Sequence, residues 1–90
     1  MMKKYTPYPF ASFARRGDTI WAARGGQQYP LYYEATDFLE ILISRGAATV
    51  DDIAADFHAR GTGHTLDEIT ASVSEVVEDL TAEGVLVLVN

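Results

Sequence analysis

Few side chains in this sequence are suited to catalysis or metal binding, and those present lack the spacing that such chemistry requires. The two histidines, His58 and His64, do not form an H-x-x-x-H pair, and the chain has no cysteine to complete a metal site. No G-x-S-x-G motif occurs, and no serine lies near a histidine in the sequence. Neither Lys-Ser/Thr nor a helix follows Gly25-Gly26, so we interpret this pair as a hairpin turn and not as a phosphate-binding loop. We therefore expect a protein that is not an enzyme and has no metal or cofactor.

A better functional candidate is the aromatic-rich stretch at residues 27–33 (QQYPLYY), which is typical of a strand. Pro30 cannot donate to a strand ladder, so this strand is expected at the edge of a sheet. Two interpretations remain open: the proline blunts the edge against aggregation, or the edge stays open to receive an extended peptide by strand addition. In the second interpretation the strand supplies the peptide-binding residues Gln28, Tyr29, Leu31, Tyr32 and Tyr33.

The second candidate is the polar face of the helix expected after Thr65. Its polar residues lie one or two turns apart beside the apolar stripe, and a solubilising surface is one explanation for them. Beside an open edge strand they would instead form the acidic wall of a groove for a basic peptide, because complementary charge steers encounter and orientation. Val76 would pack against apolar peptide side chains. The helix thus contributes the candidate residues Glu68, Ser72, Glu75, Val76 and Asp79.

The charge of the chain is unevenly placed, which excludes one class of partner. The formal net charge is -6; residues 1–34 hold five bases against two acids, whereas residues 51–90 hold nine acids and only Arg60 as a base. The helix after Thr65 is preceded by a helix and a short loop, as in a DNA-binding helix-turn-helix. It carries six acids and no lysine or arginine, so it would be repelled by phosphates. We expect no nucleic acid as a partner.

The elements that would position these residues follow from turns and periodicity. We expect three antiparallel strands, then three helices, then a short closing strand, in the order 9–16, 19–24, 27–33, 34–45, 50–61, 65–84 and 85–89. The apolar stripes predict these core positions on the helices: Phe38, Leu39, Leu42, Ile43; Val50, Ile53, Ala54, Phe57; Leu66, Ile69, Val73, Val76, Val77, Leu80.

Local signals set the expected helix ends. Gly46 should stop the first helix, Thr49 should cap the second, and Thr65 with Glu68 three residues later forms a capping box for the third. The fold class is therefore α+β, a winged helix-turn-helix in one domain spanning residues 1–90, with residues 1–8 as a possible disordered tail.

The order and spacing of these segments resemble the PqqD-like domains, which are recognition elements of ribosomally made, modified peptides. The resemblance covers residues 19–86. It rests on the strand after Gly25-Gly26, on residues 49–57 (TVDDIAADF), similar to the family's T-x-x-E-I-A-x-x-[LF], and on the apolar spacing from Val73 to Leu86 around Gly84. Tyr32-Tyr33 stand where the family often has Leu-Asn, and Ser72 stands where it has Asp.

The resemblance implies that the domain binds the leader segment of a precursor peptide as an added strand, with the third helix as the other wall of the groove. It further implies a separate processing enzyme as partner, either a transglutaminase-like leader peptidase in lasso-peptide biosynthesis or a radical S-adenosylmethionine enzyme in pyrroloquinoline quinone synthesis. The aromatic strand favours the lasso-peptide type, and a chain of 90 residues is expected to be the stand-alone kind.

Other functions stay open. The chain could be a winged-helix module for protein–protein interaction or dimerisation, through the third helix or the apolar strand at residues 85–89, or a small enzyme subunit. No apolar run reaches the roughly 18 residues that span a bilayer, and no signal peptide is recognised, so we expect a cytoplasmic protein without a membrane partner.

Overall fold

Glycine turns and short β-branched or aromatic runs fold the first third of the chain into an antiparallel sheet. The computed structural model describes residues 2–89, and this sheet has the order β2-β3-β4, formed by Ser12–Arg16, Thr19–Arg24 and Gln27–Leu31. Gly25 and Gly26 have φ values of 58° and 82°, which a two-residue hairpin between β3 and β4 requires. The three predicted strands are present, although β2 begins later and β4 ends earlier than expected, and β4 lies at one edge.

Residues 2–89 form three helices, α1 (Glu34–Arg45), α2 (Val50–His58) and α3 (Leu66–Ala82), and capping residues set the start of α2, the start of α3 and the end of α1. The capping box of Thr65 and Glu68 is confirmed, and Thr49 forms a second one with Asp52. Gly46, at φ 81°, ends α1 as predicted. Caps are local interactions, which explains why the sequence alone located these ends.

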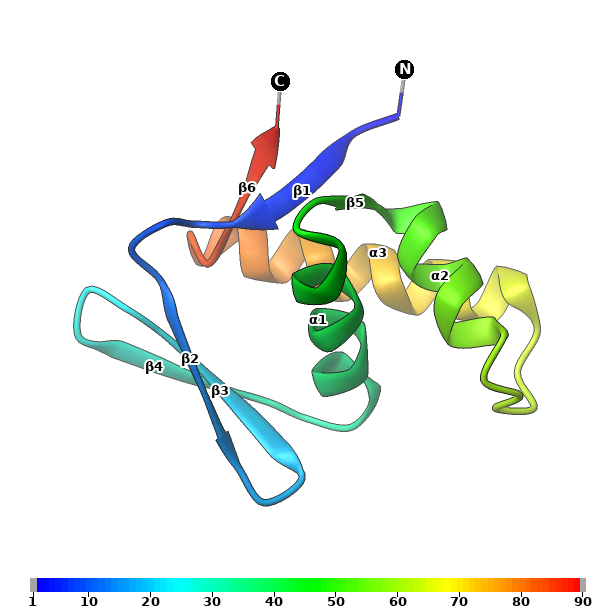
Figure 1. Ribbon diagram of the computed structural model, residues 1–90, viewed down its shortest axis with the longest axis horizontal. Coiled ribbons are helices and arrows are strands. Elements are labelled where there is room, and N and C mark those ends of the chain that lie inside the picture. Colours follow the sequence, from blue (N-terminus) through cyan, green and yellow to red (C-terminus); the bar gives the residue numbers. More distant parts are fainter. Residues whose placement is uncertain (1, 90) are drawn as a thin grey trace.

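The N-terminal residues correct one expectation. Lys4–Pro7 do not lie in a tail but form β1, which pairs with β5 (Ala48–Thr49) on one side and with β6 (Leu86–Val89) on the other. Tyr5 in this strand is buried. The closing strand is confirmed as β6, so the described residues form two three-stranded antiparallel sheets with three helices, an α+β arrangement (Figure 1).

The core lies between the three helices and the inner faces of both sheets. Phe38 of α1 and Phe57 of α2 meet edge to face with their ring centroids 4.9 Å apart. The predicted stripes are mostly buried, but Ile43 and Leu66 are exposed, at 43% and 45%. Ile41, which the stripe of the first helix omitted, is buried instead, because both β1 and the other helices contact α1.

A buried hydroxyl joins α1 to the edge of the β2-β3-β4 sheet. Thr36 Oγ1 accepts a hydrogen bond from the Ile20 N–H (3.2 Å) and donates one to the Leu31 carbonyl (2.9 Å). Ile20 and Leu31 are register partners at the last pair of the β3–β4 ladder. The first turn of α1 is thereby fixed to the end of β4.

Candidate functional site

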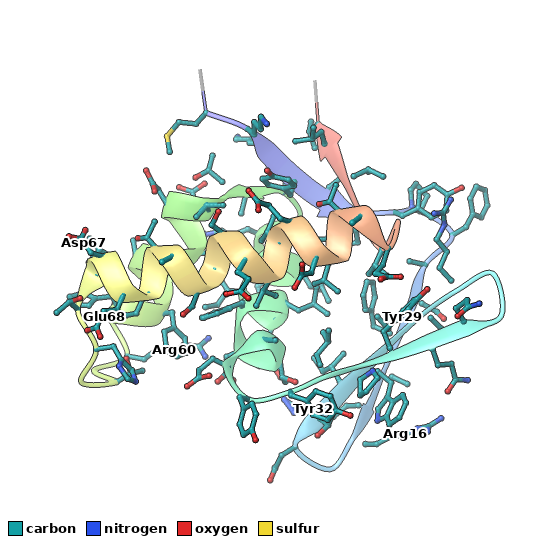
Figure 2. The ribbon with its side chains drawn as sticks, turned by 180° about the vertical axis from the view of Figure 1, so that it is seen from behind. Arg16, Tyr29, Tyr32, Arg60, Asp67 and Glu68 are labelled. Carbon is teal, nitrogen blue, oxygen red and sulfur yellow. The ribbon has the colours of Figure 1, made fainter. Side chains whose placement is uncertain are left out.

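A groove of about 310 Å³ lies between β4 and the C-terminal half of α3. Both walls belong to the segments selected from the sequence, and Figure 2 shows Tyr29 between the strand and the helix. Five of the ten predicted peptide-binding residues line it: Tyr29, Leu31, Tyr32, Val76 and Asp79. Four further residues complete the lining: Pro30, Ala35, Leu80 and Glu83.

The groove has an apolar floor and an open, more polar rim. Leu31 and Leu80 are buried, and Tyr29 and Val76 are half-buried above them. Tyr32 stands at the mouth with 65% of its surface exposed. Such a surface can take up apolar side chains without rearrangement, because its floor already belongs to the packed core.

The outer edge of β4 presents backbone groups beside this groove. The Thr36 hydroxyl bridges the Ile20 N–H and the Leu31 carbonyl, so these two groups point toward each other across β3 and β4. Because backbone direction alternates along a strand, the polar groups of Gln28 and Pro30 point the other way, away from β3. Pro30 has no N–H, so its carbonyl remains as the outward group at that position.

A carboxylate closes the groove at the far end of α3. Glu83 lies beside the Tyr29 phenol, and this neighbouring carboxylate, followed by desolvation, raises the pKa of Tyr29 above its ordinary value. Next to this pair the Arg24 guanidinium covers the Tyr8 ring at 4.3 Å. The sequence reasoning missed Glu83, although its spacing of seven residues from Val76 places both on one helix face.

The other predicted residues do not lie in this groove. Glu68 and Ser72 line a separate cavity of about 230 Å³ near the N-terminus of α3. Glu68 and Asp79 are eleven residues apart, roughly 16 Å along a helix, so one groove of this size does not contain both. Gln28, Tyr33 and Glu75 line neither space.

A third depression, of about 620 Å³, lies on the other side of Tyr32. Tyr32 and Tyr33 line it together with side chains of the β2–β3 hairpin and the first turn of α1. Tyr33 is 91% exposed and has φ 53°, an uncommon conformation for a residue with a side chain. Tyr32 therefore separates the groove from a second, more polar surface.

Within residues 2–89, no three side chains of the metal-binding types come close enough together to hold an ion. In the same part of the chain, every helix is too short or too polar to cross a membrane. Comparisons with protein-family models, with curated proteins and with solved structures find no match to this chain.

Proposed function

We propose that this protein binds an extended peptide in the groove between β4 and α3, as an additional strand on β4. The observation that supports the proposal is an apolar groove of about 310 Å³ running beside an outer strand edge. An edge offers main-chain hydrogen bonds to any extended chain, and the groove beside it offers selectivity for side chains.

The edge of β4 suits a short guest segment better than a second long strand. The carbonyls of Gln28 and Pro30 and the N–H of Gln28 point outward, but Pro30 interrupts the row of donors. A continuous ladder, as in aggregation, is thereby disfavoured. The two interpretations of Pro30 are therefore compatible: the proline limits the edge, and the groove beside it supplies the remaining affinity.

The rim charge favours a basic or neutral peptide. Asp79 and Glu83 line the groove, whereas no lysine or arginine does. Their contribution is to the rate of encounter and to orientation more than to affinity, because both carboxylates are exposed. Apolar contacts with Tyr29, Tyr32 and Val76, which still expose surface to the groove, would supply most of the binding free energy.

We further propose that the ligand is the leader of a ribosomally made precursor peptide and that the domain is a cytoplasmic, PqqD-like winged helix-turn-helix protein. The resemblance of residues 19–86 and the location of the groove support this identification. In that role the protein carries out no reaction itself. It raises the local concentration of the precursor at a separate enzyme, with a lasso-peptide leader peptidase favoured over a radical S-adenosylmethionine enzyme.

The test is a fluorescence-anisotropy titration with labelled leader segments of precursor peptides encoded beside the gene. We expect saturable binding that Val76→Asp abolishes and that Asp79→Lys weakens, because both residues line the groove. Glu78→Lys makes the same charge change on α3 outside the groove and serves as the matched control. Equal affinities of the Asp79 and Glu78 variants would refute the contribution of rim charge, and absence of binding to every leader would refute the function.

A second candidate function is dimerisation through β6. The order β5-β1-β6 leaves β6 at an edge, where Leu88 and Val89 are 46% and 42% exposed. Pairing of two β6 strands would bury these side chains. Sedimentation velocity over a range of concentrations tests it: a dimer that Leu88→Lys dissociates would support this function, and a monomer throughout would exclude it.

A further inference from the structure

The second cavity, near the N-terminus of α3, has a composition unlike that of the groove. Its floor consists of Phe38, Phe57 and Ile69, each at most 4% exposed, and its volume is about 230 Å³. The rim is polar and exposed, with Glu34 at the start of α1 and Glu68 in the first turn of α3 on its two sides. An apolar floor beneath two carboxylates suits a side chain that is apolar along its stem and cationic at its tip.

The carboxylate of Glu68 is held in place. Its Oε1 accepts a hydrogen bond from the Thr65 N–H at 2.9 Å, and this bond lowers the pKa of Glu68. Glu68 is therefore ionised at neutral pH, and its second oxygen is not part of the capping box. The residues that line the cavity include His64 beside Glu68 but no lysine or arginine, and nearby Arg60 lies 3.9 Å from Asp37 instead.

The cavity and the groove belong to one continuous surface. Along α3, Ser72 lines the cavity and Val76, one turn further, lines the groove. At the start of α1, the neighbouring residues Glu34 and Ala35 face the cavity and the groove respectively. β4 runs directly into this turn, so a chain that extends along β4 is directed toward the cavity.

We propose that the cavity receives a lysine or arginine side chain of the peptide bound in the groove. This inference rests on the proposed function and specifies the class of peptide. The aliphatic stem packs on Phe38 and Phe57, and the cation meets Glu34 and Glu68. The recognised segment thus combines apolar side chains opposite Val76 with one basic side chain at a fixed spacing.

Helix geometry gives that spacing. The cavity centres on residues 68–72 and the groove on residues 76–83, a separation of roughly 14 Å at 1.5 Å per residue. An extended peptide covers this distance in about four residues. Antiparallel addition to β4, the slightly more stable pairing, places the basic residue on the N-terminal side of the apolar segment.

The experiment selects peptides that bind the full chain from a displayed library of random sequences. One selected peptide is then synthesised with its basic residue and with glutamine in its place. Both are titrated against the wild-type protein and the double variant Glu34→Gln/Glu68→Gln. Glutamine at residue 68 keeps the acceptor of the capping box, so the helix end is preserved while the charge is removed.

Asp67→Asn/Glu78→Gln is the matched control, because it removes two charges from α3 outside the cavity. Figure 2 shows Asp67 and Glu68 on opposite sides of the first turn of α3. We expect the Glu34/Glu68 variant to bind the basic peptide about tenfold more weakly. It should bind the glutamine peptide as the wild type does, and the control should bind both peptides normally.

The outcomes separate the two proposals. The cavity proposal would be overturned, and groove binding left intact, by selected peptides that share no basic position but lose binding to the Val76→Asp variant. An equal loss of affinity in the control variant would also overturn it, because the effect would then be one of overall charge. Failure to select any peptide that depends on Val76 would overturn the proposed function itself, and the cavity proposal with it.

Discussion

The hydrogen bonds of the Thr36 hydroxyl fix β4, one wall of the groove, to α1, and they can be tested directly by substitution. Thr36 is 3% exposed, and its hydroxyl bridges the Ile20 N–H and the Leu31 carbonyl where β4 ends and α1 begins. The substitution Thr36→Val keeps the shape and branching of the side chain while it removes both hydrogen bonds. Two buried backbone groups then lose their partner.

The expected loss of stability follows from the number of buried backbone groups that lose their partner. A buried polar group left without a partner costs about 1–3 kcal/mol, which would give about 2–6 kcal/mol for two. Because Ile20 and Leu31 are register partners, their own N–H and carbonyl can approach and recover part of this loss. We therefore expect a decrease of about 2 kcal/mol in the free energy of unfolding, and a fall of roughly 8–16 °C in Tm.

Urea titration followed by tryptophan fluorescence measures this change, since the single tryptophan, Trp21, lies next to Ile20 in β3. The midpoint should fall with an unchanged m value. Thr70→Val is the matched control, because the Thr70 hydroxyl bonds the Leu66 carbonyl (2.8 Å) at an exposed site. That variant should stay within about 0.5 kcal/mol of the wild type. A Thr36 variant no less stable than this control would refute the reasoning.

Three further predictions test other parts of the structure. Tyr5→Ala should lower the free energy of unfolding by about 3 kcal/mol, because Tyr5 is 8% exposed in β1. No change in the urea denaturation curve would mean that residues 1–8 form a tail after all. Hydrogen bonds from backbone N–H groups at the helix starts lower the pKa of Asp52 and of Glu68. The ionised carboxylates therefore stabilise the fold above about pH 4, the ordinary pKa range of such groups. This stability is lost as the pH falls through the lowered pKa values. Urea midpoints of Asp52→Asn/Glu68→Gln should thus depend less on pH between neutral and acid than those of the wild type, and parallel curves would contradict this. Tyr33→Gly should keep or raise the urea midpoint, because relief of about 1–3 kcal/mol of strain at φ 53° and ψ -133° exceeds the cost of glycine, about 0.5–1 kcal/mol. A lower midpoint would show that the exposed ring stabilises the fold.

The features that the sequence predicted well are local ones. The hairpin at Gly25-Gly26 and the helix caps at Thr49 and Thr65 depend on residues at most three positions apart. The two walls of the groove were also predicted, because an aromatic strand with a proline and an amphipathic helix are each recognisable alone. The contacts that bring this strand and this helix together could not be predicted from periodicity.

The features that the sequence missed depend on distant partners. β1 is four residues long and is stabilised by β5 and β6, more than forty residues away, so its own composition gave no strand signal. Thr36 lies in the first turn of a helix, where a hydroxyl usually bonds to its own helix or to water, yet here it bonds to two strands. The division of the α3 residues between a groove and a cavity likewise depends on where α1 meets that helix.

In the proposed binding mode, recognition depends most on the turn from β4 into α1. Tyr33 lies between β4 and α1 at φ 53°, and the Ala35 N–H donates to the Tyr32 carbonyl at 3.1 Å across this turn. This conformation places Glu34 in the cavity and Ala35 in the groove, so a few backbone angles would fix the spacing between the basic and the apolar side chain of the proposed peptide. Glycine would adopt φ 53° at less cost than tyrosine. A tyrosine at this position has 91% of its surface exposed and lines the third depression with Tyr32, so its ring adds nothing to the core.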